Sequence, residues 1–225
     1  MFVLITRKLD ENIEKKLRSL IAAKIDAYVM CDEEPTKKSK RILYIPDSEM
    51  EKLGWTHHMS QKQNKITAWD KATYFAYKSG KKYVWICEDD VYWNKPSVLK
   101  EIIDKESNAD LIAYPLAPSY VETPKWFHWD KVALLTPKNK YWSATYNQLC
   151  RLSDRLLQRM HELSVQRKRL FFHEGMFATI CKMYGYKIEI LEDPNIFINF
   201  RWRPDWSEEE LKDYKKFIVH PVKLN

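Results

Sequence analysis

Apolar residues follow two different spacings along the first half of the chain, and these spacings predict strands and helices in turn. Helical spacing is found in "DENIEKKLRSLIAAK", "ITAWDKATYFAYKSG" and "SVLKEIIDKE". Short β-rich runs come before, between and after them: "FVLIT", "IDAYVMCDE", "RILYIPD", "YVWICEDD" and "ADLIAYPL". Because strands and helices alternate, we expect an α/β fold in which a mainly parallel central sheet is flanked by helices.

The second half of the chain is less regular. "TPKWFHWDKVALLTPKNKYW" predicts a hairpin or loop region rich in tryptophan. "SATYNQLCRLSDRLLQRMHELSVQR" predicts one long amphipathic helix, because Leu149, Leu152, Leu156 and Met160 lie on one stripe. "FHEGMFATICKMYG" predicts a further helix and "YKIEIL" a strand. Since no internal repeat and no linker rich in Pro, Gly or Ser interrupts the pattern, we expect residues 1–225 to form a single domain.

The overall charge narrows the choice of partner. The chain has 225 residues, a net charge of +7 and only four glycines. A positive balance favours anionic partners such as a phosphorylated substrate. The basic residues are dispersed in short runs, however, so we expect no nucleic-acid partner. No GxGxxG and no GxxxxGK[ST] is present, which excludes a glycine-rich phosphate loop.

Cysteine usage and hydropathy bear on the compartment. The four cysteines lie far apart, with no CxxC and no zinc spacing, and Cys87 and Cys181 fall within apolar runs. Buried free thiols suit a reducing compartment. No stretch approaches 18 apolar residues, and the N-terminus lacks a basic leader and a cleavage signal. We therefore expect a cytoplasmic protein with no membrane span.

The most informative motif is the acidic triplet Glu88-Asp89-Asp90, which directly follows an apolar strand. Side chains alternate along an extended backbone, so Glu88 and Asp90 can face one site while Asp89 faces another. Ligands bind at the carboxyl ends of strands in open α/β sheets. Carboxylate oxygens there suit Mg²⁺ or Mn²⁺ together with a substrate phosphate. The alternative is an acidic turn that caps the helix beginning near Pro96.

The segment "VWICEDDV" resembles the DxD motif of the GT-A glycosyltransferases, and in particular the EDD form of Golgi N-acetylglucosaminyltransferases of the mannose-branching type. Three other segments resemble further parts of that fold in the right order: "VMCDEE", "FFHEGMFATICKMYG" and "FIVHPVK". The resemblance implies a GT-A (Rossmann-like) domain. Residues 1–95 would bind the nucleotide-sugar, and residues 96–225 would bind the acceptor and supply a C-terminal metal ligand.

The resemblance also implies a metal site. The last acid of the motif, Asp90, would bind Mn²⁺ or Mg²⁺, with Glu88 or Asp89 touching ribose or metal-bound water. His220 in "VHPV" would be a second metal ligand through a neutral imidazole. A divalent cation would stabilise the charge that develops on the departing nucleoside diphosphate. Without the resemblance, a single histidine after an apolar strand is more often a packed core histidine than a metal ligand.

Glu174 is the candidate catalytic base. An inverting transferase needs a base to remove the proton of the acceptor hydroxyl, and the resemblance implies an acid at this position. Apolar residues precede Glu174, so desolvation could raise its pKa towards neutrality. Many relatives carry Asp where this chain has Glu. The alternative is a first-turn acid that is favoured only by the helix dipole.

Donor and acceptor contacts are expected from two other groups of residues. Relatives meet the nucleotide near the first strands and the helix before the EDD strand, which implies contacts from Thr6, Arg7, Asp32, Lys65 and Asp70. Their acceptors bind in the loop-rich region, which implies Trp126, Trp129 and Trp142. Aromatic faces suit sugar C–H groups, although each tryptophan could instead belong to the core.

The chain is therefore expected to be a metal-dependent glycosyltransferase. It would move a sugar from a UDP- or GDP-linked donor to a hydroxyl of a glycan or glycoconjugate. Two alternatives remain. A nucleotidyltransferase would normally show a glycine-rich loop after the first strand, which "ITRKLDEN" lacks. A non-catalytic basic module that binds nucleic acid or carbohydrate would leave the acidic triplet unexplained, because the triplet would repel a phosphate backbone.

Overall fold

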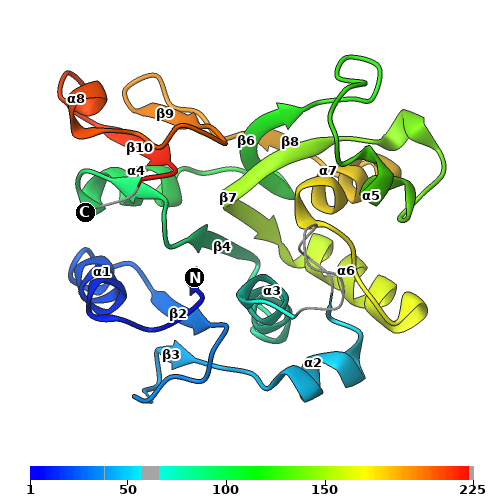
Figure 1. The fold of residues 1–225 in the computed structure, drawn as a ribbon, viewed down its shortest axis with the longest axis horizontal. Coiled ribbons are helices and arrows are strands. Elements are labelled where there is room, and N and C mark those ends of the chain that lie inside the picture. The colour runs from blue at the N-terminus through cyan, green and yellow to red at the C-terminus, as the bar shows by residue number, and fades with distance from the viewer. Residues whose placement is uncertain (38, 57–65, 223–225) are drawn as a thin grey trace.

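A seven-stranded sheet forms the centre of the protein. The computed structural model describes residues 1–37, 39–56 and 66–222. The strand order is β3-β2-β1-β4-β7-β6-β8 (Figure 1). The strands are β1 (Phe2–Thr6), β2 (Ala27–Cys31), β3 (Ile42–Leu43), β4 (Tyr83–Glu88), β6 (Leu111–Ala117), β7 (Ala144–Ser153) and β8 (Ile188–Ile190).

The sheet is mainly parallel, as the sequence predicts. Strand β1 pairs in parallel with β2 and with β4, β2 pairs in parallel with β3, and β6 pairs in parallel with β8. Strand β7 is the exception, because it runs antiparallel to both β4 and β6. The carboxyl ends of β1, β2 and β4 therefore meet at one edge of the sheet, which is where ligands bind in open α/β sheets.

Helices cover both faces of the sheet (Figure 1), which confirms the expected α/β architecture. Alternate residues of β1 and β4 enter different clusters: Val3 and Ile86 pack with α3, α6 and α7, whereas Leu4 and Cys87 pack with α1 and α4. The helices are α1 (Glu11–Ala22), α2 (Asp47–Leu53), α3 (Ala68–Lys78), α4 (Pro96–Asp104), α5 (Trp129–Ala133), α6 (Asp154–Arg167), α7 (His173–Tyr184) and α8 (Glu208–Leu211).

A second, three-stranded sheet brings the end of the described chain back to the central one. Its order is β5-β10-β9, formed by β5 (Tyr92–Trp93), β10 (Phe217–His220) and β9 (Phe197–Phe200). Strand β5 follows directly on the acidic turn after β4. Because β10 pairs with β5, the last residue of β10, His220, lies beside that turn.

The prediction of one helix over 143–167 is wrong in its first part. Residues 144–153 form β7, and α6 begins only at Asp154. Leu149 and Leu152 enter opposite faces of the sheet, so their helical spacing with Leu156 is a coincidence. The backbone of β7 pairs with strands on both sides, and this tertiary pairing outweighs local propensity.

Two other predicted segments differ from the structure in detail. The tryptophan-rich region 123–142 is a loop region, one of the two forms expected, but it also contains α5 and a short 3-10 helix, Asn139–Tyr141. The strand expected in "RILYIPD" is limited to Ile42–Leu43, and α2 begins at Asp47. In the part of the chain that the structure describes, no helix has the length and apolar character needed to cross a membrane.

Ser153 marks the change from strand to helix, and we expect its hydroxyl to stabilise the fold. It accepts a hydrogen bond from the Leu156 amide at 3.1 Å and donates one to Asp110 at 2.8 Å. Replacement by alanine should lower the free energy of unfolding by about 1–2 kcal/mol, as measured by urea denaturation. Ser48→Ala, at an exposed position in α2, is the control. Equal losses in the two variants would contradict this assignment.

Candidate functional site

The acidic triplet forms the end of β4 and the tight turn that follows. Glu88 is the last residue of β4, and the Val91 amide donates to the Glu88 carbonyl at 3.3 Å to close the turn. Lys16 of α1 holds this turn from outside: its ammonium group donates to the backbone carbonyls of Asp89 at 2.9 Å and of Val91 at 2.6 Å. Desolvation lowers the pKa of Lys16, and the nearby acids act in the opposite direction.

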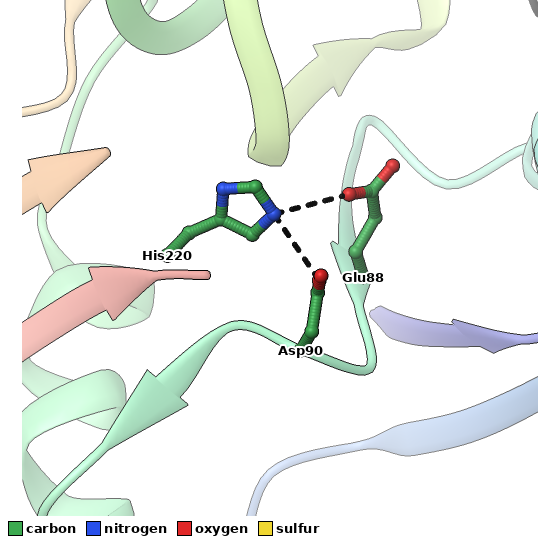
Figure 2. A group of neighbouring side chains, drawn as sticks. All are labelled: Glu88, Asp90 and His220. Carbon is green, nitrogen blue, oxygen red and sulfur yellow. Dashed lines mark ion pairs between the residues drawn. The ribbon is translucent and has the colours of Figure 1, made fainter. Parts of the chain in front are cut away.

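Glu88, Asp90 and His220 converge on one point (Figure 2). The Nε2 atom of His220 lies 3.2 Å from Oδ1 of Asp90 and 3.6 Å from Oε2 of Glu88. Figure 2 shows the imidazole of β10 reaching between a carboxylate at the end of β4 and one in the turn. One ligand atom from each residue lies within 4.8 Å of the others. The arrangement therefore has the size and donor set of a metal centre.

The chemistry of these atoms fits a divalent cation. Oδ1 of Asp90 is buried and makes no hydrogen bond to any described residue. Within the described residues, no lysine or arginine forms an ion pair with either carboxylate, and His220 is the basic side chain that faces them. Two carboxylate oxygens and one imidazole nitrogen suit Mn²⁺ better than Mg²⁺, since Mg²⁺ prefers oxygen ligands.

Asp89 points away from the other two acids, as expected, although it lies in the turn after β4 and not on extended backbone. Its Oδ2 accepts a hydrogen bond from the Thr6 hydroxyl at 2.5 Å, across the ends of β1 and β4. Desolvation raises the pKa of Asp89, and this hydrogen bond opposes the rise. Thr6 and Asp89 therefore tie the two strand ends together, and the Asp89 carboxylate does not join the metal-ligand group.

Trp69 of α3 orients Glu88. Its indole N–H donates to Oε1 of Glu88 at 2.7 Å, while Oε2 faces His220. The Trp69 ring in turn stacks on His173, with centroids 4.2 Å apart. Desolvation, and then the charge of Asp90, raise the pKa of Glu88 to about 8. A cation at this point would offset both effects.

The three residues open into a cavity of about 320 Å³. Its polar lining includes Gln148 of β7 and Glu174 of α7, and much of the remainder is aromatic. The lining residues are Glu88, Asp90, Leu116, Trp126, Phe127, His128, Tyr146, Gln148, Phe172, His173, Glu174, Trp202, Arg203, His220 and Pro221. The candidate metal ligands and the candidate base therefore share one cavity.

Glu174 has the environment of a carboxyl group that titrates near neutrality. It is the second residue of α7 and is 8% exposed. Burial raises its pKa to about 7, while a hydrogen bond from the Gln148 amide to Oε1, 3.0 Å long, acts in the opposite direction. A carboxyl group with this pKa can accept and release a proton at neutral pH.

The residues expected to contact the donor do not form one group in the structure, and each has a different partner. Arg7 is exposed and pairs with Glu33 at 2.9 Å. The Asp32 carboxylate lies 3.7 Å from the buried Lys71, which also pairs with Asp47 at 2.8 Å. Asp70 is fully buried, and its carboxylate accepts hydrogen bonds from Thr67 in the capping box of α3. Lys65 lies outside the described residues.

The three expected acceptor tryptophans form one group, but only Trp126 lines the cavity. Trp129 and Trp142 stack on each other with centroids 5.9 Å apart. Their indole N–H groups donate to the carbonyls of Thr123 and Thr136, respectively, at 2.8 Å in each case. These two side chains therefore stabilise the segment 123–136, which carries Trp126.

Sequence reasoning missed several residues of the site. Lys16 and Trp69 act on the acidic turn over long sequence separations, and no local pattern reports such contacts. Gln148 was missed because its segment was interpreted as helix. Asn147 and Gln148 are two consecutive buried polar residues in β7. Buried polar residues in a strand are uncommon, so a correct strand prediction would have marked Gln148 as a candidate site residue.

Comparison with known proteins adds a family and a set of distant structures. The family profile described as "Protein of unknown function (DUF3405)" matches residues 94–215, which is more than half of the chain. No curated protein matches.

The solved structures that match include three described as transferases. Mouse xyloside xylosyltransferase 1 is 8% identical, with 100% of this chain and 99% of that chain covered and a TM-score of 0.47. The galactosyltransferase LgtC, in complex with donor and acceptor sugar analogues, is 13% identical (88% and 76% covered, TM-score 0.44). A mannosyltransferase from Pyrobaculum calidifontis, with GDP-Man and Mn²⁺, is 13% identical (99% and 56% covered, TM-score 0.43). These likenesses are distant.

The raised pKa of Glu174 makes stability depend on pH in a defined direction. Folding holds the proton on this carboxyl, so the free energy of unfolding should fall as the pH rises from about 4.5, the usual value, to about 7. The variant Glu174→Gln cannot titrate at this position. The difference in free energy of unfolding between this variant and the native protein should therefore shift by about 2–3 kcal/mol in favour of the variant as the pH rises from 5 to 8. Urea denaturation at both pH values measures the difference. A constant difference between the two proteins would show that the Glu174 pKa is not raised by folding.

Proposed function

This chain belongs to the family described as "Protein of unknown function (DUF3405)", and we propose that it is a metal-dependent glycosyltransferase of the GT-A type. It would transfer a sugar from a UDP- or GDP-linked donor to a hydroxyl of a glycan or glycoconjugate. The observation that carries the proposal is the convergence of Glu88, Asp90 and His220 in the same cavity as Glu174.

The position of the cavity supports a nucleotide-linked donor. Its carboxylates lie where β4 ends, beside the end of β1 and near that of β2. We propose that residues 1–95 bind the nucleotide through this edge, with Thr6, Arg7 and Asp32 nearest to it. The same role for Lys65 and Asp70 stays a prediction from the resemblance. For Asp70, a contact with the donor would require its carboxylate to bind a second group besides Thr67 in the capping box of α3.

Asp90 and His220 would hold the metal, and Glu88 would complete the protein ligands. A bound Mn²⁺ or Mg²⁺ supplies positive charge for the diphosphate leaving group. Trp69 keeps one Glu88 oxygen directed towards His220. Lys16 fixes the backbone on which Asp89 and Asp90 are mounted. The presence of an imidazole among the ligands leads us to propose Mn²⁺ as the better activator.

Glu174 would act as the base of an inverting reaction. Its carboxylate removes the proton of the acceptor hydroxyl as that oxygen forms a bond to the anomeric carbon. The bond from the anomeric carbon to the donor phosphate oxygen breaks, and the nucleoside diphosphate leaves with the electron pair. Gln148 holds the carboxylate through Oε1. Trp126 would contact the acceptor directly, with Trp129 and Trp142 acting through their packing against its segment.

Loss of a metal ligand should abolish metal-dependent nucleotide binding. Calorimetric titration of the native protein with UDP and with GDP should show binding of one nucleotide that requires Mn²⁺ and is weaker with Mg²⁺. Asp90→Ala and His220→Ala should each remove the metal-dependent part, because each deletes one of three protein ligands. Asp104→Ala, an exposed acid of α4, is the matched control. Nucleotide binding that is indifferent to metal would contradict the proposed site.

Replacement of the base should separate chemistry from binding. Glu174→Gln is expected to keep metal-dependent nucleotide binding but to lower the rate of transfer by roughly 10²–10⁴-fold. In the native enzyme, kcat/KM should rise with pH through about 7, because the base must lose its proton. Proton NMR of the first product formed should show an inverted anomeric configuration. A retained configuration, or a variant with full activity, would remove Glu174 from this role.

A further inference from the structure

Two aromatic rings at the mouth of the cavity are exposed to solvent. Phe127, in the segment before α5, is 72% exposed, and Trp202, in the segment after β9, is 61% exposed. Both line the cavity that contains Glu88, Asp90, His220 and Glu174. Single exposed apolar residues are common on protein surfaces, but two such rings from separate segments at one cavity mouth call for an explanation.

Neither ring is used to build the core. The Phe127 ring contacts the ring of the adjacent His128, and the two ring centroids lie 4.0 Å apart. In the described part of the chain no aromatic ring packs against Trp202, whereas the nearby Trp206 lies under Arg201 and beside Phe197. Packing does not account for placing Phe127 and Trp202 here, and more than half of the surface of each residue is open to solvent.

We propose that Phe127 and Trp202 bind a pyranose ring of the acceptor and so determine acceptor specificity; this inference rests on the proposed function. The C–H groups on the face of a sugar ring carry partial positive charge, and the face of an aromatic ring is negative. Stacking requires no hydrogen bond from the protein, and the Phe127 side chain has no atom that could form one. The acceptor is therefore a glycoside, and its hydroxyl enters the cavity towards Glu174.

A nucleotide base would also stack on an aromatic ring, but the position of the rings favours the sugar. Phe127 and Trp202 both belong to the second half of the chain, whereas the ends of β1 and β2 belong to the first half. A base is also read by polar groups at its edge, and Phe127 offers no polar side-chain atom. The rings therefore act on the acceptor side of the metal ligands.

The test measures sugar binding and nucleotide binding separately on the full chain. Saturation-transfer NMR would be run against the methyl glycosides of glucose, galactose, mannose, xylose and N-acetylglucosamine, with Mg²⁺ present because paramagnetic Mn²⁺ would broaden the ligand signals. At least one glycoside should bind, and Phe127→Ala and Trp202→Ala should each weaken it by roughly twofold to tenfold. Trp202→Phe keeps a ring and should retain binding. Val121→Ala, which is 85% exposed in the segment preceding Phe127 and does not line the cavity, should change nothing.

Calorimetry with UDP, GDP and Mn²⁺ distinguishes the failures. In Phe127→Ala and Trp202→Ala, nucleotide binding should equal that of the native protein. Loss of nucleotide binding in these variants would assign the rings to the donor and overturn the inference. Failure of every glycoside to bind, or equal binding by native protein and both alanine variants, would overturn it too. If the native protein shows no metal-dependent nucleotide binding, the proposed function fails, and the glycoside results still decide whether the rings bind sugar.

Discussion

The site depends on how the protein accommodates three carboxylates on consecutive residues at the end of a buried strand. Each acid has a different neighbour: Trp69 donates to Glu88, Thr6 donates to Asp89, and His220 faces Asp90. Lys16 adds a positive charge, but it binds the backbone of the turn and not the carboxylates. The pairing is incomplete around Glu88 and Asp90. This is the physical reason why a divalent cation fits between them and His220.

The rest of the fold can be understood as support for that arrangement. Parallel pairing of β1 with β4 brings Thr6 to Asp89, and the small second sheet carries His220 to the turn through the pairing of β10 with β5. Strand β7, inserted antiparallel beside β4, presents Gln148 to Glu174. Four distant parts of the chain therefore supply the candidate metal ligands, the candidate base and its amide partner to one cavity: Glu88 and Asp90, Gln148, Glu174, and His220.

The sequence predicts those parts of the site that depend on local pattern. The sequence predicts that Glu88 and Asp90 face one site and Asp89 another, and the structure agrees. The reason differs from the predicted one, because Asp89 and Asp90 lie in a turn after β4 and not on extended backbone. The α/β architecture follows from alternating strands and helices. Lys16 and Trp69 could not be predicted, because their contacts span 73 and 19 residues and depend on packing. Gln148 could not be predicted either, because the leucines of β7 and α6 happen to have a helical spacing and the whole segment was therefore predicted to be helix.

The most direct test of a metal centre is an anomalous difference map from crystals grown with Mn²⁺ and the nucleotide that binds. We expect one peak within coordination distance of Asp90 and His220, next to Glu88 and in contact with the diphosphate. We also expect the Asp89 carboxylate to stay on Thr6. A nucleotide bound in the cavity with no peak at these residues, or a peak held by other side chains, would contradict the proposed metal centre.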